Sequence, residues 1–137
     1  MNIYIVVSTF YKDLANELIN GATKESSYNI NIVQVPGAFE IPGMVKQILD
    51  NKKVDLIVTL GVLIKGETNH FEYISESIAN SISKLTISSN IPIIFGVIMA
   101  LNYEQASERA LVSKKNKGAE VMRTGLKMLE LYEQYKK

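Results

Sequence analysis

The chain has 137 residues, of which 47% are hydrophobic and 21% charged, and its net charge is +1. A chain of this length and composition forms one domain with one core, and its charge gives no indication of a nucleic-acid or anionic-membrane partner. The sequence has no cysteine and one histidine, which excludes disulfides and thiolate metal sites. No apolar run approaches the ~20 residues that cross a bilayer, and residues 1–7 lack a signal-peptide pattern, so we expect no membrane partner and a cytoplasmic protein.

Strand-like and helix-like segments alternate along the whole chain. Short runs rich in β-branched residues predict strands at residues 3–7, 30–35, 54–60 and 91–98. Apolar residues at helical spacing predict helices at residues 11–24, 41–49, 70–85, 104–111 and 116–132. Pro42 fits the first turn of the second helix, where its missing N–H does no harm.

Strands separated by helices favour βαβ units and a parallel sheet covered on both faces. We therefore expect residues 1–137 to form a single domain, a three-layer α/β/α sandwich of flavodoxin-like type with a four-stranded parallel sheet. Ligands of such sheets bind outside the carboxyl ends of the strands. The expected ligand loops follow Ser8, Val35, Leu60 and Val97.

The segment 61–73 carries the clearest functional signal. It follows a predicted strand, is expected to turn at Gly61 and Gly66, and opens a helix at His70. Free backbone N–H groups and the positive end of a helix dipole make such a place an anion site. Because histidine gives and takes protons near neutral pH, the segment predicts chemistry on a phosphorylated small molecule. A structural or merely exposed His70 is the alternative.

Other candidates have two interpretations each. Phe10 follows the first strand and could stack on a planar heterocycle, or it could fill the core. Glu40 could accept hydrogen bonds from ligand hydroxyls, or it could be a carboxylate favoured by a helix N-terminus. Arg109 and Lys117 suit phosphate, or they belong to a solvated basic face.

Three blocks of sequence, taken together, resemble the lumazine synthase family of riboflavin biosynthesis. The first is Val-Pro-Gly-Ala-Phe-Glu-Ile-Pro at residues 35–42, and the second is residues 61–73. The third combines Phe-Gly-Val at 95–97, Glu-Gln-Ala at 104–106, Glu-Arg-Ala at 108–110 and Asn-Lys-Gly at 116–118. Their order and spacing are more specific than any single block, and the resemblance extends to about Leu131.

The resemblance implies a reaction between two small-molecule substrates, one of them phosphorylated. 5-Amino-6-(ribitylamino)uracil condenses with 3,4-dihydroxy-2-butanone 4-phosphate to give 6,7-dimethyl-8-ribityllumazine, phosphate and water. No cofactor and no metal is required.

The resemblance also implies a role for each candidate residue. Phe10 stacks on the pyrimidine, and the ribityl chain is held by Ala38, Phe39 and Glu40. The strand end that reads the ring edge through backbone groups is Val62, Leu63 and Ile64. Glu67 and Thr68 form the turn that takes the phosphate, and His70 is the general acid and base. The residues lent by a neighbouring subunit are Phe95, Arg109 and Lys117, with Arg109 the main phosphate ligand.

A homo-oligomer follows from this sharing, and the resemblance implies a ring of five. A shell of twelve rings (60 subunits) is the alternative to the free pentamer, which we favour because the chain starts at its first strand. The chain departs from the family pattern at Thr9, Tyr11, Lys65 and residues 99–102. These departures leave two other functions open: a protein that holds flavin or lumazine without making it, and a structural shell protein.

Overall fold

A computed structural model of the chain describes residues 1–67 and 70–136. Within these residues it contains four strands, five α-helices and two 3₁₀ turns. They follow one another as β1 (Asn2–Ser8), α1 (Lys12–Thr23), β2 (Asn29–Val35), η1 (Ala38–Glu40), α2 (Ile41–Asn51), β3 (Leu56–Ile64), η2 (Lys65–Glu67), α3 (Phe71–Ser88), β4 (Ile93–Ala100), α4 (Tyr103–Ala110) and α5 (Lys117–Gln134).

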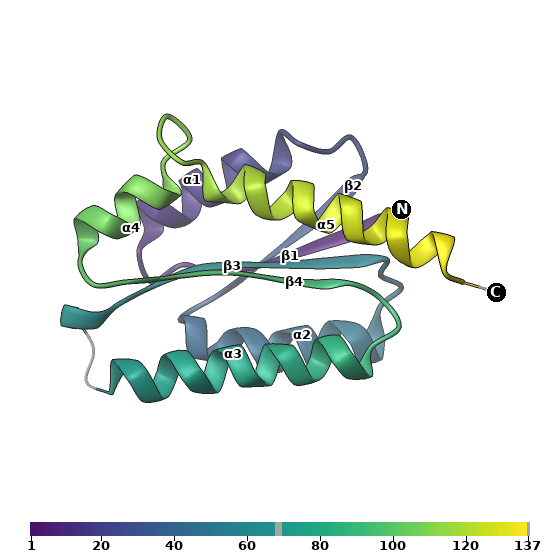
Figure 1. Ribbon diagram of the computed structural model, residues 1–137, viewed down its shortest axis with the longest axis horizontal. Helices are drawn as coiled ribbons and strands as arrows, with labels where there is room; N and C mark the ends of the chain where they lie inside the picture. Colours follow the sequence, from purple (N-terminus) through teal and green to yellow (C-terminus); the bar gives the residue numbers. More distant parts are fainter. Residues whose placement is uncertain (68–69, 137) are drawn as a thin grey trace.

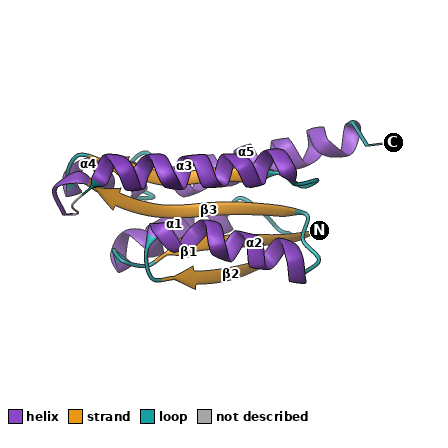
Figure 2. Ribbon diagram, turned by 90° about the horizontal axis from the view of Figure 1, so that it is seen from below, coloured by secondary structure: helices purple, strands orange, loops and turns teal. Residues whose placement is uncertain are grey.

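The four strands form one parallel sheet in the order β2-β1-β3-β4. Helices α1, α4 and α5 cover one face of the sheet, and α2 and α3 cover the other (Figure 1). Seen from the second face, α2 and α3 run roughly along the strands, and the arrowheads of β2 and β3 lie towards the same end (Figure 2). The predicted α/β/α sandwich with a four-stranded parallel sheet is confirmed, and the strand order agrees with the flavodoxin-like type.

Helices on both faces bury the central strands from both sides. Ile5 faces the core beneath α1 and α5, and its neighbour Val6 faces the core beneath α2 and α3. Both side chains are fully buried. This explains why the central strands appear in the sequence as continuous apolar runs without a polar alternation. None of the described helices combines the length and apolar character that a bilayer crossing needs.

Strand β3 is longer than its sequence pattern predicted. The predicted turn at Gly61 is wrong, because the strand continues to Ile64 and pairs with β4 as far as Ala100. A Cβ at Gly61 would collide with the Ser8 hydroxyl, so this glycine allows close packing of β3 and β1. The turn occurs only at Gly66, in η2. Two of the ligand loops therefore start later than predicted, after Ile64 and after Ala100.

Helices α1 and α5 pack closely at Gly118, where a Cβ would collide with the backbone carbonyl of Leu18. We expect Gly118→Ala to lower the free energy of unfolding by about 1–3 kcal/mol, the usual cost of overpacking. Gly43→Ala in α2 is the matched control, because a Cβ there meets nothing within 4 Å. It should be neutral or stabilise by up to about 1 kcal/mol. Chemical denaturation measures the free energy of unfolding of both variants. Equal values for Gly118→Ala and Gly43→Ala would contradict the close α1–α5 contact.

Candidate active site

A pocket of about 180 Å³ lies at the carboxyl ends of β1, β2 and β3. Seven residues that the sequence singled out meet there, and they come from three separate chain segments. They are Phe10, Ala38, Phe39, Glu40, Val62, Leu63 and Ile64. Parallel strands bring their carboxyl ends to one edge of the sheet, so residues more than fifty positions apart share this wall.

Phe10 lies at the rim of this pocket. Its side chain is 69% exposed, so the interpretation of Phe10 as a core residue is wrong. The ring contacts Tyr11 edge-on, with centroids 5.0 Å apart and planes at 76°. An exposed aromatic face beside a pocket suits stacking on a flat ring.

The loop after β2 forms the second part of the wall. Ala38 is buried and Phe39 is exposed. The Glu40 N–H donates to the Gly37 carbonyl at 3.2 Å, which closes the 3₁₀ turn η1. A Cβ at Gly37 would lie 2.9 Å from Oε1 of Glu40, so the carboxylate folds back over this glycine at the pocket. Glu40 is also the N-cap residue of α2, and both of its interpretations fit this place.

The end of β3 presents backbone atoms to the pocket. The side chains of Val62 and Ile64 are buried in the core beneath α1 and α4. Strand β1 stops pairing with β3 at Leu60, whereas β4 pairs as far as Ile64. Among the described residues, no strand therefore takes the β1-facing N–H and C=O groups of residues 62–64. These groups are free to recognise the edge of a ring.

His70 lies one helical turn before Ile74, a residue that lines the pocket. It is the N-cap residue of α3, with φ 65° and ψ 35°, and it is exposed. Its carbonyl accepts the N–H of Ile74 at 3.0 Å, and Ile74 lines the pocket. A left-handed backbone in a residue other than glycine is uncommon and often marks a functional site.

An ion pair spans the turn that leads into α3. Lys65 Nζ lies 2.9 Å from Oε1 of Glu72, and both side chains are exposed. The hydrogen bond from the Lys65 ammonium lowers the pKa of the Glu72 carboxyl. The two residues of the predicted phosphate turn fall between Lys65 and Glu72 in the sequence: Glu67 belongs to η2, and Thr68 lies outside the described residues.

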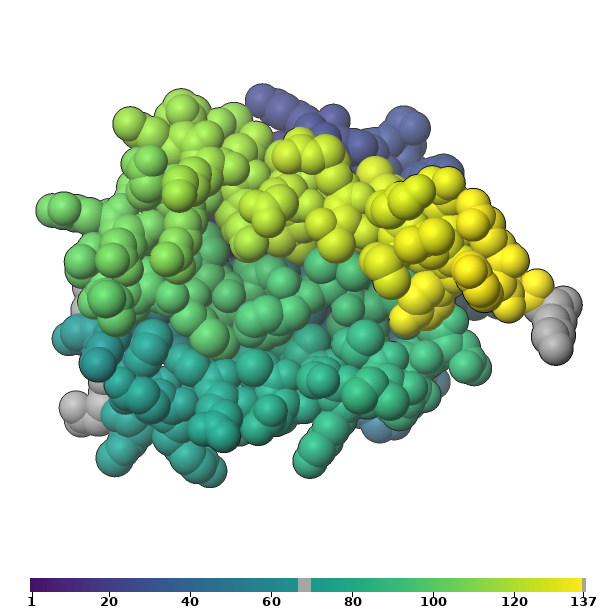
Figure 3. All heavy atoms as spheres, in the orientation of Figure 1, coloured from purple at the N-terminus to yellow at the C-terminus, as the bar shows by residue number. Residues whose placement is uncertain are grey.

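The three residues predicted to come from a neighbouring subunit do not line the pocket of their own chain. Phe95 lies on the edge strand β4 with a partly exposed ring. Arg109 Nη1 donates to the Met99 carbonyl at 3.1 Å, near the carboxyl end of β4. Lys117 Nζ pairs with Oε1 of Glu120 at 3.2 Å. Figure 3 shows the surface above α3, along which α4 and α5 follow one another. Within one chain, the structure does not bring these three residues into the pocket.

Three further residues line the pocket that were not among the predicted site residues: Tyr11, Gly37 and Ile74. Tyr11 and Gly37 belong to the expected ligand loops after Ser8 and Val35. Ile74 was recognisable only as part of the apolar stripe of a helix. Its position one turn after His70 was the available signal. Tyr11 also contacts Tyr103 across a centroid distance of 6.3 Å, which places two departures from the family pattern, Tyr11 and residues 99–102, near each other.

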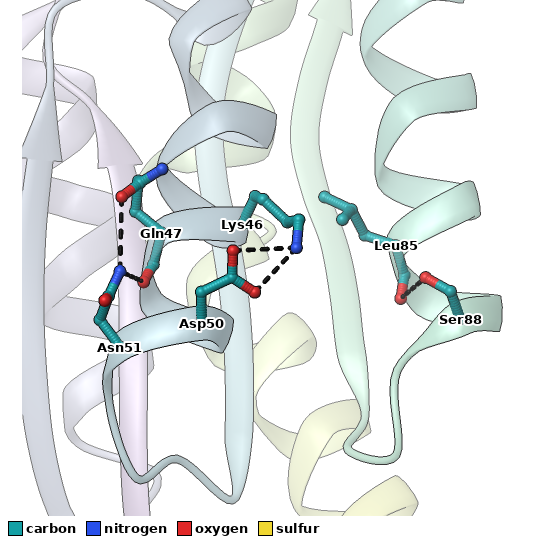
Figure 4. Close-up of polar contacts among 6 residues, drawn as sticks. All are labelled: Lys46, Gln47, Asp50, Asn51, Leu85 and Ser88. Atoms are coloured by element: carbon teal, nitrogen blue, oxygen red, sulfur yellow. Dashed lines mark hydrogen bonds and ion pairs between the residues drawn. The ribbon is translucent and has the colours of Figure 1, made fainter.

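A larger cavity, about 600 Å³, lies at the opposite edge of the sheet, beside the carboxyl ends of α2 and α3. Three of its charged groups, Lys46, Asp50 and Asp55, have partners. Lys46 Nζ pairs with Asp50 at 2.7 Å (Figure 4), and Asp55 accepts the Asn2 N–H at 2.7 Å. Parallel α/β proteins bind ligands at the carboxyl edge, so the smaller pocket is the candidate. In residues 1–67 and 70–136, no cluster of His, Cys, Asp or Glu is arranged to hold a metal.

The fold and the pocket define a flavodoxin-like α/β protein with a candidate ligand pocket at the carboxyl edge of its sheet. The chain belongs to the 6,7-dimethyl-8-ribityllumazine synthase family, whose sequence model matches residues 1–133. It is 43% identical over 134 residues to the 6,7-dimethyl-8-ribityllumazine synthase of Limosilactobacillus reuteri, covering 95% of this chain and 88% of that protein. It is 41% identical over 140 residues to the enzyme of the same name from Leuconostoc mesenteroides subsp. mesenteroides, covering 98% of this chain and 90% of that protein.

Proposed function

We propose that the chain, acting as one domain, condenses 5-amino-6-(ribitylamino)uracil with 3,4-dihydroxy-2-butanone 4-phosphate to give 6,7-dimethyl-8-ribityllumazine. This is the penultimate step of riboflavin biosynthesis. The observation that carries the proposal is the family match over residues 1–133. The pocket at the carboxyl edge, with Phe10 and the free backbone of residues 62–64, supports it.

The chemistry needs two substrates held together and a group that moves protons. The ring amine attacks the ketone, and loss of water leaves a Schiff base. Phosphate then leaves by elimination, and attack of the ribityl-bearing nitrogen closes the second ring with loss of a second water. Holding both reactants in attack geometry can contribute up to about 7–11 kcal/mol. His70 is the proposed proton carrier, because it is exposed and lies one helical turn before Ile74, which lines the pocket.

Each candidate residue has a place in this proposal. Phe10 stacks on the pyrimidine, the backbone of residues 62–64 reads its edge, and the ribityl chain lies along Ala38, Phe39 and Glu40. The phosphate lies at Glu67 and Thr68.

Incubating the purified chain with both substrates and following lumazine absorbance tests the function directly. Complementation of a riboflavin auxotroph tests it in cells. Tight binding of flavin without any turnover would contradict the proposal and favour a binding protein.

We infer that a neighbouring subunit completes the site, in a ring of five in the cytoplasm. One chain's pocket of about 180 Å³ is small beside the about 300–1,000 Å³ of typical ligand sites. Phe10 and Phe39 are largely exposed at its rim. The candidate phosphate ligands Arg109 and Lys117, with Phe95, lie away from the chain's own pocket and would serve the next one. Closed rings satisfy every such head-to-tail contact.

Mixing two impaired variants, assayed at a phosphorylated-substrate level near the wild-type KM, tests the sharing. His70→Ala and Arg109→Ala rings each carry one defect in every site. After subunit exchange, we expect mixed rings to regain some intact sites and some activity, because one site can take His70 from an Arg109→Ala chain and Arg109 from a neighbouring His70→Ala chain. Native mass spectrometry verifies the exchange and gives the ring size. Verified exchange without recovered activity would mean that each chain builds its own site.

A further inference from the structure

Three aromatic rings follow one another from the pocket to the start of α4. Phe10 and Tyr11 have centroids 5.0 Å apart with planes at 76°, and Tyr11 and Tyr103 have centroids 6.3 Å apart with planes at 63°. Both are edge-to-face arrangements, the geometry that aromatic pairs prefer. The first two rings line the pocket, whereas Tyr103 does not.

The two tyrosines are anchored by their helices. Tyr11 is the N-cap residue of α1, and its carbonyl accepts the Ala15 N–H at 2.9 Å. Tyr103 opens α4 directly after the cap Asn102, whose side chain accepts the Gln105 N–H at 2.8 Å. Oε1 of Gln105 accepts the Leu101 N–H at 2.9 Å in return. Reciprocal bonds of this kind fix a helix start, so Tyr103 is held independently of the pocket.

Phe10 has the opposite character, because 69% of its side chain is exposed. A ring with so few neighbours samples several orientations unless a contact selects one. Stacking requires one particular plane, and fixing that plane before binding lowers the entropy cost of binding. Tyr11 supplies an edge against the Phe10 ring, and Tyr103 supplies an edge against Tyr11.

We propose that Tyr11 and Tyr103 form an aromatic brace that holds the Phe10 ring in the plane in which it stacks on the pyrimidine substrate. The brace rests on the function proposed above. Tyr11 and Tyr103 are positioning residues, and Tyr103 acts only through Tyr11. The brace concerns the pyrimidine and leaves the phosphorylated substrate unaffected.

The test compares alanine with phenylalanine at both tyrosines. Tyr11→Ala and Tyr103→Ala should each raise KM for the pyrimidine about two- to tenfold, the contribution of one aromatic pair. KM for the phosphorylated substrate and kcat should change little. Tyr11→Phe and Tyr103→Phe should keep most of the wild-type affinity, because the ring makes the contact. Tyr28→Ala is the matched control, as Tyr28 is about as exposed as Tyr103 and lies directly before β2, outside the pocket.

Two further measurements distinguish the brace from two tyrosines that each contact the substrate separately. If the brace acts as a unit, the double alanine variant binds the pyrimidine no more weakly than Tyr11→Ala alone. Calorimetry with the pyrimidine alone should give the same ratios of variant to wild-type affinity in the absence of turnover. Tyr103→Ala keeps the test open if Tyr11→Ala does not fold, since Tyr103 is an exposed side chain.

A loss for Tyr11→Phe as large as for Tyr11→Ala would overturn the brace, because the hydroxyl would then be the group that matters. An unchanged KM in Tyr103→Ala would overturn it as well. Wild-type protein that makes no lumazine would refute the proposed function. Active wild type with unaffected tyrosine variants would refute only the brace.

Discussion

Arg109→Ala is expected to raise the half-saturating level of the phosphorylated substrate about 10- to 150-fold, while the pyrimidine is hardly affected. The size corresponds to the about 1.5–3 kcal/mol lost when a hydrogen bond to a charged group is removed. Arg109 lies near the carboxyl end of β4, where Nη1 donates to the Met99 carbonyl. The guanidinium has further donors, and its fork matches two phosphate oxygens. Steady-state kinetics with each substrate varied in turn measures the effect.

Two control variants are used: Arg123→Ala, at the other arginine of the chain, and Arg109→Lys. Arg123→Ala removes a guanidinium that is paired with Glu25 at 3.1 Å, and it should leave both KM values unchanged. Arg109→Lys keeps the charge and loses the fork, so an intermediate loss is expected. Equal weakening towards both substrates would show that Arg109 supports the structure around Met99 and does not hold phosphate.

His70→Ala is expected to lower turnover by about tenfold or more, while both substrates still bind. General acid–base catalysis typically contributes ~10²–10⁴-fold. A loss of only about tenfold is compatible with this role, since an amine and a ketone also condense without an enzyme. Single-turnover measurements with saturating substrates separate the chemical step from binding.

His70→Asn distinguishes the imidazole from the backbone that carries it. The residue has φ 65°, a conformation that asparagine accepts more readily than alanine. We expect His70→Asn to be as slow as His70→Ala but more stable. Restored turnover in His70→Asn would assign the effect to the turn, and an unchanged rate in both variants would remove His70 from the mechanism.

Much of the fold could be predicted from the sequence alone, because the alternating β-branched and helical patterns reflect which surfaces become buried. The apolar runs of β1 and β3 reflect burial on both faces of a parallel sheet. The site residues at 35–42 and 61–73 were recognised by their order and spacing, and the resemblance they carry agrees with the family match. Pro42 marked the first turn of α2 for a local steric reason.

Other features depend on the tertiary structure and could not be predicted from local sequence patterns. Gly61 suggests a turn when considered alone, but it continues a strand because the Ser8 hydroxyl occupies the place of its Cβ. Phe10 resembles a core residue in sequence and lies exposed at the pocket rim. The contact between Tyr11 and Tyr103 joins loops that follow different strands. Each outcome depends on neighbours distant in sequence, whose positions only the packed sheet fixes.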